Sequence, residues 1–157
     1  MLEEKIKWNE KYAKNFISKP SPLLKYIPSK KAKALDLAGG IGANAEILLQ
    51  KGYNVTLIDI SDIAISKITL PIKKICLDLD NYIIPQNEYD VILMIKYFNL
   101  NLLRQIPKAL KKDGFFVFKT GGKYSIEKDL FFDIFKNFQT LHFKEDFEYV
   151  GVKKVEG

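Results

Sequence analysis

The chain has 157 residues, of which 47% are hydrophobic and 28% are charged, and its formal net charge is +6 at pH 7. This length suits one domain with a buried core, and the composition excludes a disordered chain. No apolar run reaches the roughly 18 residues that a membrane span requires, and no signal-peptide pattern is present. The single cysteine, Cys76, excludes an internal disulfide and a cysteine-based zinc site. We therefore expect a single cytoplasmic domain over residues 1–157, with no membrane association.

The excess positive charge lies in the first fifth of the chain. Residues 1–33 hold nine of the 25 basic side chains but only three of the 19 acidic ones. One interpretation is a basic face near an anionic substrate or a nucleic acid, and the other is a solvated lysine-rich helix. Only Arg104 is an arginine, which disfavours a protein that reads nucleic-acid sequence through bidentate contacts.

The first predicted elements are helical. Residues 2–18 have the apolar spacing of an amphipathic helix, with Trp8 and Tyr12 one turn apart. Prolines at positions 20, 22 and 28 interrupt the segment that follows, which has room for one short helical turn. We expect residues 1–30 to form a helical lid or cap on a core made by residues 31–157.

Strands and helices alternate through the rest of the chain. Such alternation predicts right-handed crossovers and a parallel sheet, and residues 140–155 read as an antiparallel pair of strands. The expected fold is therefore α/β: a Rossmann-like three-layer α/β/α sandwich whose seven-stranded sheet is mostly parallel and ends in a C-terminal antiparallel hairpin. The predicted strands before that hairpin span residues 32–37, 54–58, 73–77, 89–95 and 115–119, and the predicted helices span 41–51, 61–67, 100–111 and 127–137.

A glycine-rich turn follows the first predicted strand, and an acid follows the second. The turn runs from Ala38 to Gly42, and Asp59 comes 19 residues after Gly40. Glycines allow a ligand to approach the backbone closely, and an acid at the end of the second strand accepts hydrogen bonds from ribose hydroxyls. Together these features predict a ligand that contains adenosine.

Two ligands fit this pattern to different degrees. Residues 40–45 match the G-x-G-x-x-A pattern of dinucleotide sites, which is weak evidence by itself. Asp36, four residues before Gly40, would repel a pyrophosphate but suits a cationic amino-acid group. S-adenosylmethionine carries a sulfonium and an ammonium and has no phosphate, so we favour it.

From residue 32 onward the sequence resembles the class I S-adenosylmethionine-dependent methyltransferases. The segment ALDLAGGIGANAEILLQKGYNVTLIDIS (34–61) resembles the first two motifs of that family, and LDLD (77–80) falls at its third. YDVILMIKYFN (89–99) and LKKDGFFVFKT (110–120) resemble its fourth and fifth strands. KWNEKYAKNF (7–16) is similar to a Trp-x-x-x-Tyr helix that lies over the cofactor in tellurite-resistance-type and thiopurine-type relatives. The match is specific for fold and cofactor and much less so for the acceptor.

The resemblance implies a role for each matching position. Asp36 holds the ammonium of the cofactor directly or through water, Asp59 takes the ribose hydroxyls, and Ala38 stands where the family commonly has its first glycine. Alanine fits there provided that its φ stays negative. The implied cofactor-binding residues are Tyr12, Asp36, Ala38, Gly39, Gly40, Gly42, Asp59, Ile60, Asp78, Leu79 and Met94, and the implied acceptor-binding residues are Trp8, Lys96 and Tyr97.

Structural roles remain open for several of these residues. Asp36 and Asp59 could each cap a following helix, and of Asp78 and the nearby Asp80 either could simply be a solvated surface acid. Trp8 and Tyr12 could anchor the first helix to the core instead of a ligand.

The absence of catalytic motifs shapes the expected reaction. The fourth strand is not followed by an Asn/Asp-Pro-Pro-aromatic motif, and the sequence holds no cysteine nucleophile, metal-binding carboxylate set or well-placed histidine. We therefore expect methyl transfer to a small acceptor that is already nucleophilic, such as a thiol, chalcogenide or amine, with no catalytic side chain. The alternatives are a protein or RNA acceptor, a binding module without activity, and a nicotinamide-dependent oxidoreductase. A lid could come from residues 1–30 or from residues 121–124.

Overall fold

The computed structural model describes residues 2–14, 17–120 and 126–155, so the predicted lid loop at 121–124 lies outside the described residues. The strands in this part of the chain are β1 (Lys33–Leu37), β2 (Asn54–Asp59), β3 (Lys73–Cys76), β4 (Tyr89–Ile95), β5 (Leu110–Lys119), β6 (Phe138–Lys144) and β7 (Glu148–Lys153). The helices are α1 (Leu2–Ala13), α2 (Ala43–Gln50), α3 (Asp62–Ser66), α4 (Leu100–Ala109) and α5 (Lys128–Ile134), with a 3-10 helix, η1 (Pro22–Tyr26).

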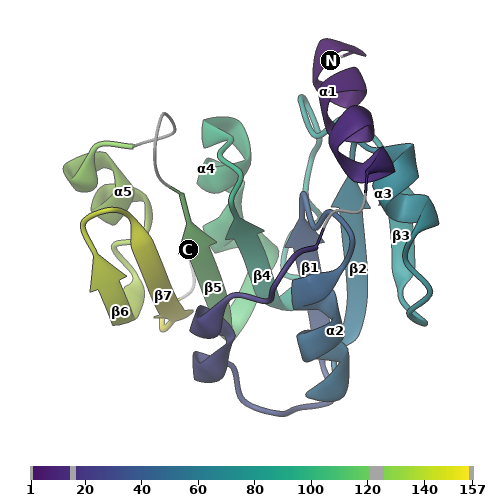
Figure 1. Cartoon of the computed structure of the whole chain (residues 1–157). Helices are drawn as coiled ribbons and strands as arrows, with labels where there is room; N and C mark the ends of the chain where they lie inside the picture. Colours follow the sequence, from purple (N-terminus) through teal and green to yellow (C-terminus); the bar gives the residue numbers. More distant parts are fainter. Residues whose placement is uncertain (1, 15–16, 121–125, 156–157) are drawn as a thin grey trace.

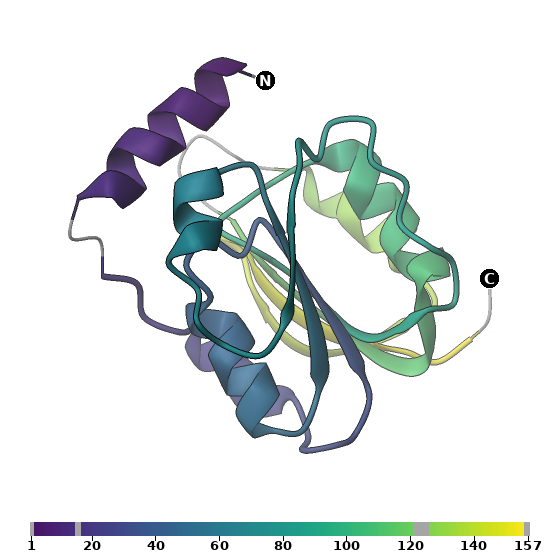
Figure 2. The same cartoon turned by 90° about the vertical axis from the view of Figure 1, so that its right-hand side faces the viewer.

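The seven strands make one sheet with the order β3-β2-β1-β4-β5-β7-β6. Neighbouring strands from β3 to β5 are parallel, whereas β7 runs antiparallel to both β5 and β6. Helices cover both faces of the sheet (Figures 1 and 2). This arrangement confirms the predicted three-layer α/β fold with a C-terminal antiparallel hairpin.

Each face of the sheet carries its own apolar core. Leu35 and Leu37 of β1 pack in the cluster that includes residues of α4 and α5. Ala34 packs on the opposite face, in the cluster that includes residues of η1 and α2. Stacked aromatic rings strengthen the first cluster, since Phe135 lies 4.9 Å from Phe116 between ring centroids. Both faces of the central strands are therefore buried, which explains their continuous apolar sequences.

Many element boundaries differ from those predicted by one to three residues, and two differ by five. Helix α1 ends at Ala13 instead of residue 18. Strand β5 begins at Leu110, directly after α4, because Leu110 pairs with Tyr89 of β4. The predicted turn at 113–114 is an irregularity inside β5, where Asp113 has a φ of +67°.

The parallel strands direct their carboxyl ends to one edge of the molecule. Helix α1 lies beyond the carboxyl ends of β1 and β2, beside α3 (Figure 1). In sheets of this kind ligands bind at that edge. None of the helices in the described ranges is long and apolar enough to cross a membrane.

Candidate functional site

The glycine-rich turn after β1 takes left-handed backbone conformations. Gly40 has a φ of +59° and Gly42, the N-cap of α2, a φ of +90°. The expectation that Ala38 keeps a negative φ is wrong, because its φ is +59°. A left-handed alanine costs roughly 1–2 kcal/mol relative to its preferred conformation. The turn holds this conformation with backbone hydrogen bonds from Gly39 N to Ile58 O (3.2 Å) and from Gly42 N to Gly39 O (3.2 Å).

Side chains would not fit at the centre of this turn. A Cβ on Gly39 would lie 2.7 Å from Asp36 Oδ2, and a Cβ on Gly40 would lie 2.6 Å from the Tyr12 hydroxyl oxygen. The glycines therefore allow Tyr12 of α1 and Asp36 of β1 to approach the turn closely.

Asp59 ties the turn to the end of β2. Its Oδ2 accepts a hydrogen bond from Gly40 N (2.8 Å), and its Oδ1 accepts one from Ser61 N (2.9 Å). Burial raises the pKa of the Asp59 carboxyl, and these backbone N–H groups oppose the rise. Each carboxylate oxygen keeps a lone pair for a further donor. Ser61 itself caps α3 through a bond from Ala64 N to its hydroxyl, as predicted.

Asp36 is a buried carboxyl with an oxygen that lacks a partner. Its exposed fraction is 1%, and Oδ2 accepts no hydrogen bond from any residue that the structure describes. Burial, and then the charge of Asp59, raise the Asp36 pKa to about 8. A buried acid in this state favours a cationic group beside it, which would satisfy the free oxygen and restore the carboxylate.

Helix α1 is attached at this edge by polar contacts with α3. Asn9 accepts a hydrogen bond from the Ser61 hydroxyl and donates one to Asp62 Oδ1 (2.8 Å). Lys67 donates to the carbonyl of Tyr12. Burial, with Asp59 and Asp36 nearby, raises the Tyr12 pKa to about 12, so its hydroxyl keeps its proton at neutral pH.

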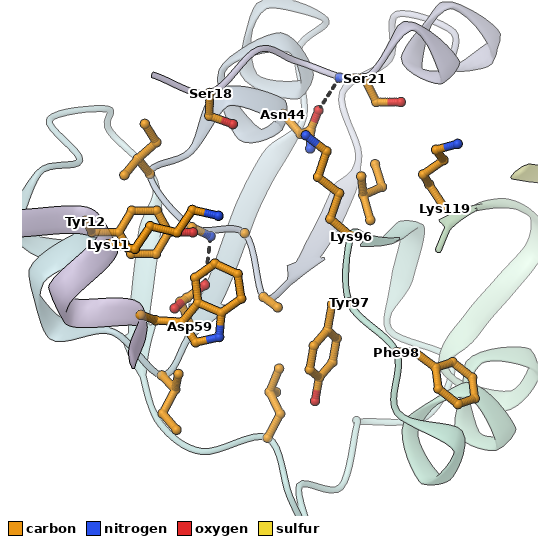
Figure 3. A pocket seen from close by; sticks show the side chains of 18 of the residues that line it. Lys11, Tyr12, Ser18, Ser21, Asn44, Asp59, Lys96, Tyr97, Phe98 and Lys119 are labelled. Carbon is orange, nitrogen blue, oxygen red and sulfur yellow. Dashed lines mark hydrogen bonds between the residues drawn. The ribbon is translucent and has the colours of Figure 1, made fainter. Parts of the chain in front are cut away.

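These elements enclose a cavity of about 1070 Å³ (Figure 3). It extends from α1 across the glycine-rich turn to the residues that follow β4. A bond from Ser21 N to Asn44 Oδ1 (2.7 Å) joins the segment before η1 to the first turn of α2 at its rim. Eleven of the predicted site residues line the cavity: Trp8, Tyr12, Ala38, Gly39, Gly40, Asp59, Ile60, Asp78, Leu79, Lys96 and Tyr97.

Three predicted residues are not in the cavity lining. Gly42 is buried behind the turn, where a Cβ would meet Ile68 and Leu70. Asp36 lies beneath the turn, against Gly39. Met94 differs most from its predicted place: it is fully buried in the core cluster that includes α4 and α5, and its neighbour Ile95 lines the cavity instead. Alternation of side chains along β4 explains the difference.

The sequence reasoning missed several lining residues. Lys11, Asn44 and Lys119 line the cavity, together with the segment from Ser18 to Pro22. Lys119 could have been found, because it ends a parallel strand and carboxyl ends of such strands meet at one edge. No local pattern identifies the other positions, whose place depends on how distant elements pack.

Among the residues that the structure describes, the lining near the end of β4 contains no candidate for a strong general base. Burial raises the pKa of the Tyr97 phenol, so Tyr97 stays protonated at neutral pH. His142 is outside the lining and contacts Tyr26 and Glu148. Among residues 2–14, 17–120 and 126–155, no group of three or more His, Cys, Asp or Glu residues could hold a metal ion.

Comparisons with known proteins show what the chain is similar to. A family model described as a methyltransferase domain matches residues 8–148. An uncharacterised protein of Methanocaldococcus jannaschii is 32% identical over 139 residues; the match covers 86% of this chain and 61% of the relative, so the chain spans less than two thirds of that protein.

Two solved structures show the same fold at low sequence identity. TehB from Haemophilus influenzae has a TM-score of 0.68 at 17% identity, with 96% of this chain and 67% of that one covered. A TehB-like S-adenosylmethionine-dependent methyltransferase from Corynebacterium glutamicum has a TM-score of 0.65 at 19% identity, with 98% and 97% covered.

Proposed function

The chain belongs to the methyltransferase domain family, and on that premise we propose that it transfers a methyl group from S-adenosylmethionine to a small nucleophilic acceptor. The transfer is an in-line displacement at the carboxyl edge of the sheet, with no side chain acting as a base.

The observation that carries this proposal is the pair of acids around the glycine-rich turn. Asp36 offers a buried carboxyl oxygen without a hydrogen-bond partner among the described residues, which fits the cofactor's ammonium. Asp59 is held at the end of β2 by Gly40 N and Ser61 N, with lone pairs left for ribose hydroxyls. Ile60, Asp78 and Leu79 line the same part of the cavity and are the proposed adenine contacts.

The protein's own contribution to the reaction is binding, orientation and exclusion of water. When bound, S-adenosylmethionine supplies a methyl group on a sulfonium, which is already a strong electrophile. Tyr12 and Trp8 cover the cavity from α1, and Tyr97 borders it from the segment after β4. Because both tyrosines keep their protons, they act as hydrogen-bond donors and pocket walls, and the acceptor has to arrive as a competent nucleophile.

The position of α1 favours a small acceptor over a protein or RNA. Trp8, Lys11 and Tyr12 all line the cavity, so the helix covers part of it. Its volume of about 1070 Å³ is near the upper end of typical small-ligand sites. A cofactor and a small second molecule fit such an enclosure better than a segment of a macromolecule.

Two measurements test the proposal. Calorimetry should show binding of S-adenosylhomocysteine and no binding of NADH. The NADH titration is the control, because a dinucleotide site would bind it. Methyl donor labelled with a radioactive methyl group should transfer its label to a member of a panel of small thiols, selenols and amines. Label that appears only in bulk RNA or cell protein would show a macromolecular acceptor, and binding without transfer to any acceptor would show a module without activity.

Substitution of Gly40 by alanine should weaken the binding of S-adenosylhomocysteine by roughly 5- to 30-fold, the effect of about 1–2 kcal/mol. The added Cβ collides with the Tyr12 hydroxyl and requires a left-handed alanine. The matched control is Gly52→Ala, which also replaces a glycine of positive φ (+103°), but at the end of α2 remote from the cavity. Equal losses of affinity in both variants would contradict the role of the turn.

A further inference from the structure

At the carboxyl ends of the strands, acidic and basic side chains line different parts of the cavity, and the N-terminal segment adds Glu4, Lys11 and Lys19 to the lining. Asp59, Asp78 and Asp80 lie where β2 and β3 end, and Lys96 and Lys119 lie where β4 and β5 end. Figure 3 shows both lysine side chains on the side of the cavity away from Asp59. This separation of charges matters because the proposed cofactor occupies the part with the acidic side chains. Lys96 and Lys119 are then left to face the methyl acceptor.

The two lysines come from adjacent strands and are joined through the backbone. Lys119 pairs with Ile95 in the β4–β5 register, and Lys96 N donates to Lys119 O (2.8 Å). Lys96 has a φ of +59°, an uncommon conformation for a residue with a Cβ. Its side chain is exposed at the cavity, and its ammonium makes no ion pair or hydrogen bond with the residues that the structure describes.

Lys119 is positioned by an acid outside the cavity lining. Its Nζ lies 2.9 Å from Glu148 Oε2, and the other oxygen of Glu148 lies 3.0 Å from His142 Nε2. An ammonium has three donors, so the bond to Glu148 fixes Lys119 and leaves donors for a ligand. Glu148 balances one of the two lysine charges, and Lys96 supplies the net positive charge at this part of the cavity.

From this arrangement we infer that the methyl acceptor is a small anion, held by Lys96 and Lys119 through its negative group. The inference rests on the proposed function and narrows it. Two ammonium groups attract a carboxylate or thiolate and repel an ammonium, so a small amine that carries no anionic group is excluded from the classes of acceptor considered above. They also favour the thiolate form of a thiol, which is its nucleophilic form.

Three thiols of nearly equal size test the inference, because they differ mainly in charge. We would titrate 3-mercaptopropionate, 2-mercaptoethanol and cysteamine into the protein saturated with S-adenosylhomocysteine and follow binding by NMR. The acid should bind at least tenfold more tightly than the amine, with the alcohol between them. Propionate as a fourth probe separates the two anionic groups: binding equal to that of 3-mercaptopropionate assigns the site to the carboxylate, and much weaker binding assigns it to the thiolate.

Variants of the lysines provide the second part of the test. Lys96→Gln and Lys119→Gln should each reduce the preference for the acid by about 3- to 10-fold, whereas the control Lys112→Gln, at an exposed position of β5 outside the cavity, should leave it unchanged. Equal or tighter binding of cysteamine, no binding of any probe, or an unchanged preference in both lysine variants would overturn the inference.

A further control separates the acceptor from the cofactor. If Lys96→Gln weakens S-adenosylhomocysteine but not 5′-methylthioadenosine, which lacks the amino-acid group, then Lys96 binds the cofactor's carboxylate and the inference is wrong. Failure of the wild-type protein to bind S-adenosylhomocysteine would contradict the proposed function instead. In that case the same four probes, titrated into the protein alone, would still decide whether the lysines select an anion.

Discussion

Substitution of Asp59 by alanine should weaken the binding of S-adenosylhomocysteine by roughly 10- to 150-fold, which corresponds to the 1.5–3 kcal/mol of a hydrogen bond to a charged group. Asp59 is the proposed acceptor for the ribose hydroxyls. It also holds the turn in place, because its two oxygens accept bonds from Gly40 N and Ser61 N. The loss therefore combines a missing ligand contact with a less ordered turn. Isothermal titration calorimetry measures it directly.

Two variants separate these contributions. Asp59→Asn keeps one oxygen but places an amide N–H group against a backbone N–H donor. This variant should therefore lose affinity while disturbing the packing less than Asp59→Ala does. Asp113→Asn is the matched control, because Asp113 is an exposed acid in β5 outside the cavity lining. Thermal melting checks that each variant is folded at the titration temperature. An Asp59→Ala protein that binds as tightly as Asp113→Asn would contradict the role of Asp59.

Binding of S-adenosylhomocysteine should strengthen as the pH rises from 5.5 to 7.5, by up to tenfold per pH unit. The pKa of Asp36 is about 8, raised by burial and then by Asp59, so the free protein carries a proton there throughout this range. A bound ammonium favours the carboxylate, so binding has to release that proton, and release becomes easier as the pH rises. Asp36→Asn should abolish most of this pH dependence and lower the affinity at pH 7.5 by about tenfold or more.

The stability of the ligand-free protein should change with pH in the opposite direction. In the unfolded chain Asp36 ionises near its ordinary pKa of 3.8, whereas in the folded protein it keeps its proton up to a pH of about 8. The free energy of unfolding therefore falls as the pH rises through this window, and Asp36→Asn should reduce the fall. Chemical denaturation at pH 5 and pH 8 compares the variant with Asp113→Asn. Affinity that is independent of pH in the wild type, or equally dependent in Asp36→Asn, would contradict this account.

The sequence predicted those features of the fold and site that depend on residues close together in the chain. Strand β4 has the predicted bounds, because a continuous apolar run between polar residues marks a strand buried on both faces. The same burial hides which side chains face the cavity, and this is why Met94, which packs in the core, was assigned to the site. Ser61 was recognised as a helix cap because that role depends on residues within one turn.

Features that depend on distant contacts could not be predicted in this way. The left-handed φ of Ala38 is imposed by a turn that hydrogen-bonds to β2, and its sequence gives no sign of it. Strand β5 begins at Leu110 because of its pairing with β4, which overrides the local turn signal of Asp113 and Gly114. The pairing of Lys119 with Glu148 joins residues 29 positions apart and requires the antiparallel strand β7.

The way in which α1 is attached has a consequence for the kinetics of ligand exchange. Tyr12 is the one buried side chain of α1 among the described residues, and the bonds that join α1 to Ser61, Asp62 and Lys67 are polar contacts. Detachment of such a helix leaves both apolar clusters intact, so its free energy is far below that of global unfolding. If this helix covers the bound nucleoside as we propose, we expect the bonds between α1 and α3 to control how fast the nucleoside leaves, and mutations that stabilise only the two apolar clusters to have little effect on that rate.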